Sequence, residues 1–125
     1  GHHSLSHHQG NADKIANIAK IDRFYMENFA EFLQKLNRVK EGEGTLLDNC
    51  AIVYGSGLSD ANRHSHHDLP VLLAGGRNMG YQPGRHVILD KDKETPMANL
   101  YLTMLRRLGV KADTLGDSTA FLSGI

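Results

Sequence analysis

Most histidines of this 125-residue chain are gathered in two short polar segments. Imidazole is the commonest protein ligand of transition metals, and it titrates near neutral pH. The two segments flank a long helical pattern and a short apolar run, so a fold could bring them together. The sequence therefore predicts a metal site or a proton-transfer site that draws on both segments. Seven of the eight histidines belong to them: His2, His3, His7 and His8, then His64, His66 and His67.

The spacing within the first segment suits a pair of metal ligands. His3 and His7 are four residues apart, and on a helical turn two such side chains share one face. Paired imidazoles at this spacing are typical of zinc sites, whereas His2 and His8 would point elsewhere. No cysteine lies near either segment, which argues against a thiolate site. The predicted ligands of a divalent metal, zinc or a similar ion, are His3, His7, His64, His66, His67 and Asp68, with Asp60 as a further carboxylate.

The second histidine segment belongs to a long polar loop, residues 55–68. Such a length exceeds that of most passive connections, and ligands of open α/β sheets bind beyond the carboxyl ends of strands. Ser56 and Arg63 are candidate substrate-binding residues, the arginine as the partner of an anionic group. Ser56 lacks the glycine spacing of a nucleophile elbow, so no catalytic residue is assigned. The competing interpretation is that the histidines cap loops and donate hydrogen bonds to backbone carbonyls.

The elements that must position these side chains begin with a helix over residues 12–39. Apolar side chains recur there at intervals of three and four, which predicts an amphipathic helix. Asn11 suits the N-cap, and the glycines at 42 and 44 end the helix. The aromatic residues of this stretch are expected to pack in the core: Phe24, Tyr25, Phe29 and Phe32.

Short continuous apolar runs predict two buried strands, at residues 50–54 and 69–74, and residues 85–89 predict a third strand at an edge. Such runs are typical of parallel sheets with both faces covered. A second helix is expected to begin at Thr95-Pro96 and to end at Gly109. The pattern predicts an α/β fold, a fragment of a layered, mainly parallel sheet flanked by helices.

Composition narrows the class of protein. The chain is 40% apolar and 22% charged with a formal net charge of zero, which fits a globular domain without the basic face of a nucleic-acid-binding protein. No apolar run approaches the roughly 20 residues of a membrane span. Cys50 is expected to be a small core residue. We expect residues 1–125 to form a single domain or the C-terminal part of a larger α/β domain, packed against the remainder of that chain or a homo-oligomer partner.

The beginning of the chain fits a fragment better than a purification tag. It starts at Gly1 without an initiator methionine or a signal peptide. Ser4-Leu5-Ser6 interrupts the histidines, whereas a tag is normally an unbroken run. The sequence therefore predicts a piece cut from a longer protein.

Residues His3–His8 resemble the His-x-x-Ser-His-His signature of the HXXSHH family of uncharacterised exported bacterial proteins. The similarity continues through residues 44–49, 54–59, 64–75 and 116–119. This resemblance implies the C-terminal part of an exported protein that is secreted, periplasmic or at the cell surface.

The same family is similar, more distantly, to alkaline phosphatase-like hydrolases, which bind two metal ions. That similarity implies that His3 and His7 stand where one ligand pair stands, and His64 or His66 where a later histidine stands. Gly57-Leu58 occupies the strand end that carries an Asp-His pair in those enzymes, so a single-metal site or a non-catalytic descendant stays open.

The function expected from these observations is metal-dependent hydrolysis of a small-molecule ester. Its alternative is a non-catalytic surface or scaffold protein that retains the fold without metals. A third interpretation is an assembly module whose histidines respond to pH.

Overall fold

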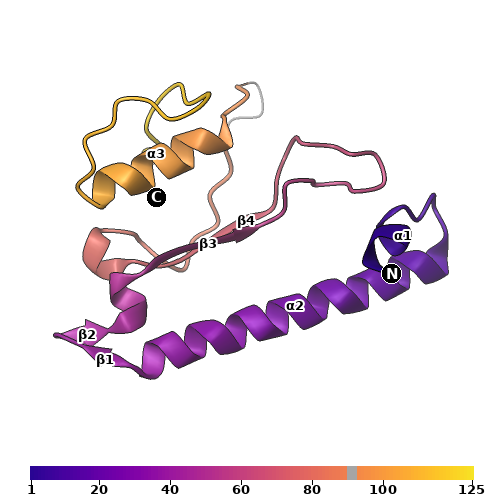
Figure 1. The fold of residues 1–125 in the computed structure, drawn as a ribbon, viewed down its shortest axis with the longest axis horizontal. Helices are drawn as coiled ribbons and strands as arrows, with labels where there is room; N and C mark the ends of the chain where they lie inside the picture. Colours follow the sequence, from indigo (N-terminus) through magenta and orange to yellow (C-terminus); the bar gives the residue numbers. More distant parts are fainter. Residues whose placement is uncertain (90–92) are drawn as a thin grey trace.

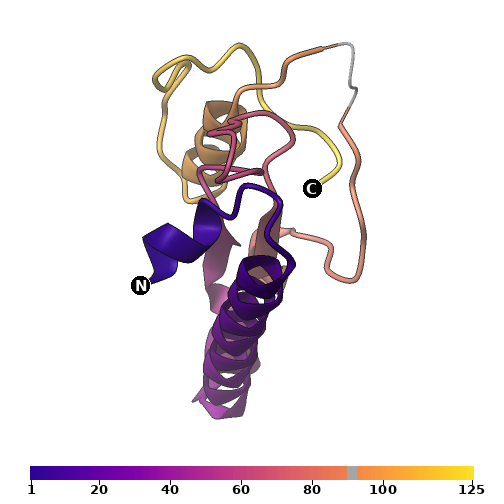
Figure 2. The ribbon, with the colours of Figure 1, turned by 90° about the vertical axis from the view of Figure 1, so that its right-hand side faces the viewer.

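The fold places a two-stranded sheet between two helices, as Figure 1 shows. The structure, a computed structural model, describes residues 1–89 and 93–125. Helix α2 (Ala12–Arg38) lies on one side of the hairpin formed by strands β3 (Ala51–Gly55) and β4 (Val71–Gly75), and helix α3 (Met97–Arg107) lies on the other. A view turned by 90° shows the same order (Figure 2).

Helix α2 confirms the helix predicted over residues 12–39. The Asn11 side chain accepts a hydrogen bond from the Lys14 N–H at 3.0 Å, which satisfies one of the free donors at the helix start. The solvent-facing surface carries ion pairs one turn apart, Arg23–Glu27 and Glu31–Lys35, each at 2.8 Å. Such exposed pairs contribute little to stability.

The aromatic residues of α2 are less buried than the periodicity predicts. Phe24, Tyr25 and Phe32 are 59%, 47% and 46% exposed, so their assignment to the core was wrong. Phe29 is half-buried and stacks on Tyr54 of β3, with ring centres 4.5 Å apart. The helix thus meets the hairpin through part of its apolar stripe, because the two-stranded sheet is too narrow to cover the rest.

A short connection turns the chain from α2 into the sheet. Strands β1 (Lys40–Glu41) and β2 (Gly44–Thr45) pair antiparallel, and the 3₁₀ helix η1 (Leu46–Asn49) follows. Asp48 fixes this turn, because its carboxylate accepts hydrogen bonds from the Thr45 N–H and hydroxyl, both at 2.9 Å. Cys50 comes next and is only half-buried, outside the strand and not in a core.

The central sheet is antiparallel, so the predicted mainly parallel α/β fold was wrong. Ala51 pairs with Gly75 and Gly55 with Val71 across the two strands. Parallel neighbours need a crossover that returns the chain to the starting edge. Here the intervening loop instead folds back on itself, with a bridge between Asp60 and Ser65. The described residues form three helices of the α type and two small two-stranded antiparallel sheets.

The predicted third strand does not form. Residues 85–89 have no strand partner in the described structure, and Ile88 is 74% exposed. An apolar run indicates that its side chains favour a strand, but it does not show that a neighbouring strand is available to pair with it. The 3₁₀ helix η2 (Arg77–Met79) precedes this extended segment.

The best-buried residues lie around α3. Tyr81, Leu100 and Leu102 form the buried apolar set. The helix begins one residue later than predicted, with Pro96 at the N-cap, and Gly109 follows its end with a φ of +82°. None of the helices among the described residues has both the length and the apolar character that crossing a bilayer requires.

Candidate functional site

The first histidine segment folds into a helical turn, as its spacing predicts. Helix α1 (His2–Ser6) ends at His7, whose N–H donates to the His3 carbonyl at 3.2 Å. The two imidazole rings share one face, with ring centres 4.6 Å apart and planes at 77°. The two rings therefore lie side by side on this turn, and their role as metal ligands stays a prediction.

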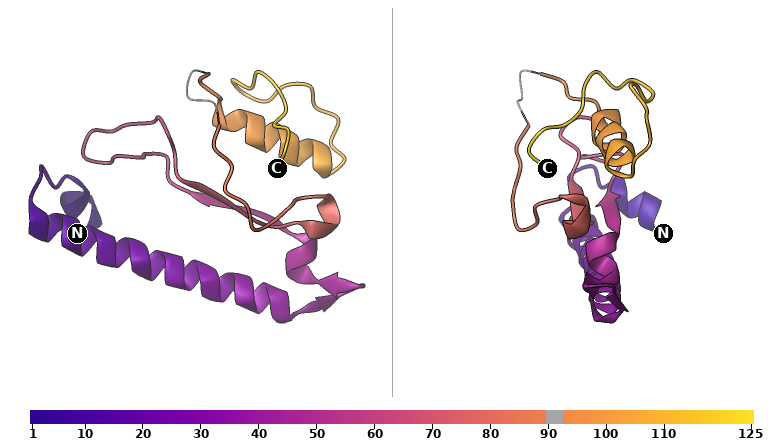
Figure 3. Two further views of the ribbon diagram at one scale, coloured as in Figure 1. Left: turned by 180° about the vertical axis from the view of Figure 1, so that it is seen from behind. Right: turned by 90° about the vertical axis from the view of Figure 1, so that its left-hand side faces the viewer.

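The second histidine segment reaches the first. The loop of residues 56–70 extends along α2 toward α1, as the reverse view shows (Figure 3). It places His64 beside His7, with ring centres 4.9 Å apart and planes at 60°. A hydrogen bond of 2.9 Å from the Gln9 N–H to the Asn62 side-chain oxygen joins the two segments close by. His3, His7 and His64 therefore form one group, called the histidine cluster below.

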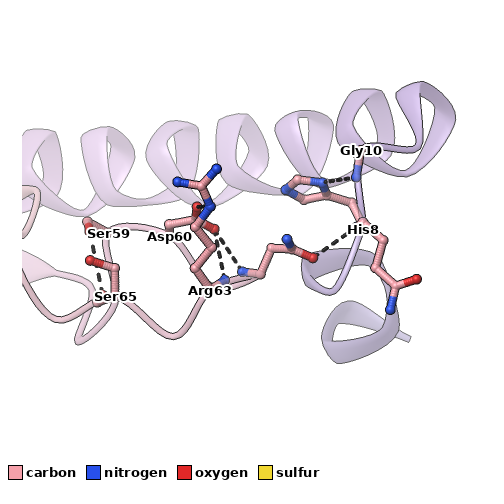
Figure 4. Close-up of polar contacts among 8 residues, drawn as sticks. His8, Gly10, Ser59, Asp60, Arg63 and Ser65 are labelled. Carbon is pink, nitrogen blue, oxygen red and sulfur yellow. Dashed lines mark hydrogen bonds and ion pairs between the residues drawn. The ribbon is translucent and has the colours of Figure 1, made fainter.

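Asp60 builds the turn that presents His64 (Figure 4). One carboxylate oxygen accepts hydrogen bonds from the N–H groups of Asn62 and Arg63, at 2.9 and 3.2 Å. Ser59 and Asp60 exchange backbone hydrogen bonds with Ser65 across the base of the turn, both 3.0 Å long. His64 itself has a φ of +55°, a conformation that side-chain-bearing residues adopt only when their surroundings hold them there.

Arg63, the predicted anion-binding residue, lies in this same turn. Its Nε is 3.6 Å from the second carboxylate oxygen of Asp60, and its side chain is 83% exposed. An exposed pair at this distance contributes little to stability. The guanidinium is therefore accessible to an anionic ligand in solvent.

The environment of His7 favours the neutral form of its imidazole. Desolvation is the largest cause that lowers the pKa of His7, and the neighbouring positive charges of His3, His64 and Lys14 lower it further. Lys14 stays close because its ammonium donates to the His7 carbonyl at 3.4 Å. A neutral imidazole offers the lone pair that a metal ion needs.

The other predicted ligands lie apart from the histidine cluster. His66 Nδ1 is 2.9 Å from the Gly57 carbonyl, so this side chain holds the loop where it leaves β3. His67 Nδ1 is 3.8 Å from a carboxylate oxygen of Glu94, and both side chains are exposed. His66 and His67 also line a broad cleft of about 1820 Å³. Other site residues and histidines on its walls are Ser56, Asp68, His2 and His8.

The histidine cluster fits a metal ion in side-chain type and in ring spacing. Two imidazoles bound to one tetrahedral zinc ion, at metal–nitrogen distances of about 2.0–2.1 Å, have ring centres about 5 Å apart. The spacings of 4.6 and 4.9 Å are close to that value. The ring nitrogens do not converge as they stand: among the described residues, no three histidine, cysteine or acidic side chains are arranged to hold an ion. Binding therefore requires side-chain rotation.

Two supporting residues could not be found from the sequence pattern. Lys14 and Gln9 carry no metal-ligand chemistry, and each acts through contacts made only in the folded chain. Gln9 has a φ of +50°, which turns its N–H toward the loop of residues 56–70. Comparison of the chain with family models, curated proteins and solved structures gives no match.

Proposed function

We propose that this protein binds a divalent transition metal ion, zinc or a similar ion, through His3, His7 and His64. The observation that carries the proposal is the position of the His7 ring. It lies 4.6 Å from the His3 ring and 4.9 Å from the His64 ring, although His64 is far away in the sequence. The lowered pKa of His7 supports ligation, since a metal ion then competes less with protons for this ring.

The activity that we propose for this site is hydrolysis of a small-molecule ester. His3, His7 and His64 would hold the ion, a ligand set of the type found in catalytic zinc sites. The chemistry that it would supply is polarisation of an ester oxygen or a lowered pKa of a water molecule. His66, His67 and Asp68 line the broad cleft, where they would serve as proton carriers, and exposed Arg63 would bind an anionic group of the substrate.

Metal titration tests the proposal directly. The protein is purified without a metal column, stripped with a chelator and titrated with Zn²⁺ and Co²⁺ by calorimetry and absorbance. We expect one equivalent to bind, with the intense visible bands of tetrahedral Co²⁺. At 100 times the dissociation constant, the ion should stabilise the fold by about 2.7 kcal/mol, a rise in melting temperature of about 10 °C.

The variants His7→Ala and His64→Ala identify the ligands. Each should weaken binding about tenfold or more, since even loss of a supporting residue has an effect of this size. His86→Ala is the matched control, because His86 is exposed and lies outside both histidine segments. The site would be refuted if added zinc left the melting temperature of the metal-free protein unchanged. Equal losses of metal affinity in all three variants would refute it as well.

A non-catalytic scaffold protein is the second candidate function. The exposed apolar stripe of α2 favours it, because large exposed patches commonly mark association surfaces. The partner would be the remainder of a longer chain or a second copy of this one. Sedimentation velocity together with ester hydrolysis by metal-loaded protein separates the two functions: association without hydrolysis supports the scaffold alone.

The resemblance of residues 3–8 to the HXXSHH signature adds the expectation of export. We propose that the protein is secreted, periplasmic or at the cell surface. Fractionation of cells that express the gene at its natural level tests this, and recovery only from the cytosol would contradict it.

A further inference from the structure

A smaller cavity lies between the hairpin and α3 and adjoins the broad cleft, with which it shares Ser56 and Val71. Its volume is about 370 Å³, within the range of small-molecule sites, roughly 300–1,000 Å³. None of its wall residues is a histidine, so it is distinct from the histidine cluster. Its walls come from the end of β3, the start of β4 and the first turns of α3.

The walls are apolar on two opposite sides. Val53 and Val71 face the cavity from the sheet, and Met97 and Tyr101, one turn apart, face it from α3. Val53, Val71 and Met97 are half-buried. Ligand sites commonly combine apolar walls of this kind with a few polar groups.

One part of the cavity wall is polar. Gly55, Ser56 and Gly57 form it, and the two glycines leave the backbone accessible there. The Ser56 hydroxyl oxygen accepts a hydrogen bond from the Leu58 N–H at 3.2 Å. A hydroxyl has one donor and two acceptor positions, so it retains the capacity to bind one polar group of a ligand.

We propose that this cavity binds a small, uncharged, mainly apolar molecule that carries one hydroxyl group, such as an alkylphenol. The aromatic or alkyl body would contact Val53, Val71 and Met97, and its hydroxyl would pair with Ser56. The volume admits about a dozen non-hydrogen atoms and excludes a peptide helix. No charged side chain lines the cavity within the described chain, so a charged ligand would lose its hydration without compensation.

Methyl NMR with 4-ethylphenol as the probe tests this proposal. Binding should shift the methyl resonances of Val53, Val71 and Met97, with a dissociation constant on the order of 1 mM for a ligand of this size. Ethylbenzene, which lacks the hydroxyl, should bind several-fold more weakly, and 4-ethylbenzoate should leave these resonances in place. No metal is needed, so the result is independent of the function proposed for the histidine cluster.

Two substitutions from opposite walls establish the location. Val71→Phe and Met97→Trp should each fill the cavity and weaken binding at least fivefold. Leu72→Phe is the matched control, because Leu72 is the next residue of β4, is 45% exposed and lies outside the cavity wall. Unchanged affinity in both filling variants, in protein whose circular dichroism is unaltered, would overturn the proposal. Shifts spread equally over the exposed residues of α2 would overturn it as well.

Discussion

Asn99 attaches the first part of the C-terminal segment to α3. It is 3% exposed, and its side-chain oxygen accepts hydrogen bonds from the N–H groups of Thr119 at 2.7 Å and Ala120 at 3.3 Å. Its amide nitrogen donates to the Thr119 hydroxyl at 3.2 Å. This segment has no regular structure of its own, and Asn99 holds its residues 119–120. Further along, Thr103 of α3 accepts a hydrogen bond from the Leu122 N–H at 2.8 Å. We therefore expect Asn99→Ala to loosen the segment around Thr119 while its later residues stay attached.

The magnitude follows from the three hydrogen bonds and their surroundings. A typical bond contributes about 1 kcal/mol net, and the 3.3 Å bond contributes least, so the sum is about 2–2.5 kcal/mol. Thr119 and Ala120 are exposed, so water can satisfy their N–H groups after the substitution. Alanine also favours a helix over asparagine by about 0.5 kcal/mol. We expect a net loss of about 1.5–2 kcal/mol in the free energy of unfolding.

Urea denaturation measures this loss, and amide hydrogen exchange locates it. The Thr119 N–H should exchange much faster in Asn99→Ala than in the wild type. Asn28→Ala is the matched control, because Asn28 is exposed on α2 and its side chain donates only to the Phe24 carbonyl of the same helix. Its stability should stay within about 0.5 kcal/mol of the wild type. Unchanged exchange at Thr119 in Asn99→Ala would refute the attachment that we describe.

Two further predictions concern the histidine cluster and a buried turn. The pKa of His7 is lowered from 6.5 in the folded chain, so below pH 6.5 the folded state binds fewer protons than the unfolded state. The contribution of His7 to the free energy of unfolding is therefore fully present above pH 6.5 and is lost as the pH falls through the folded pKa. In chelator, the melting temperature should therefore fall more steeply below pH 6.5 in the wild type than in His7→Gln; parallel curves would contradict this. Gly76→Ala should lower the free energy of unfolding by about 3 kcal/mol, because Gly76 has a φ of +70° and an added Cβ would overlap a buried tyrosine ring. Gly124→Ala, with a φ of +75° and open space around the Cβ, should lower the free energy of unfolding by only about 1 kcal/mol. Equal losses in the two variants would show that overlap with the tyrosine ring has no effect.

Features set by local physical chemistry could be predicted from the sequence. The start of α2 follows from the Asn11 side chain, which bonds to an N–H three residues on. The contact between His3 and His7 follows from the geometry of one helical turn. Neither feature needs a partner from elsewhere in the chain, and both are present in the structure.

Features that depend on distant partners were harder to predict. The apolar runs that form β3 and β4 indicated strands buried on both faces, but a run of residues does not encode the direction of its neighbour. Direction is decided by the loop between them, where the Asp60 carboxylate binds the N–H groups of Asn62 and Arg63 and turns the chain back. The error in the direction of β4 therefore lies in one loop, and the error at residues 85–89 lies in the lack of a strand partner.

The same loop explains why the histidine cluster exists although the predicted parallel sheet does not. In a parallel arrangement, a crossover would have carried the chain away from the end of β3. In the antiparallel hairpin, the loop projects beyond the sheet along α2, and its tip reaches α1. There the Gln9–Asn62 hydrogen bond fixes its position and brings His64 to His7. The meeting of the two histidine segments is thus a consequence of the hairpin, whereas the spacing of His3 and His7 belongs to α1 alone.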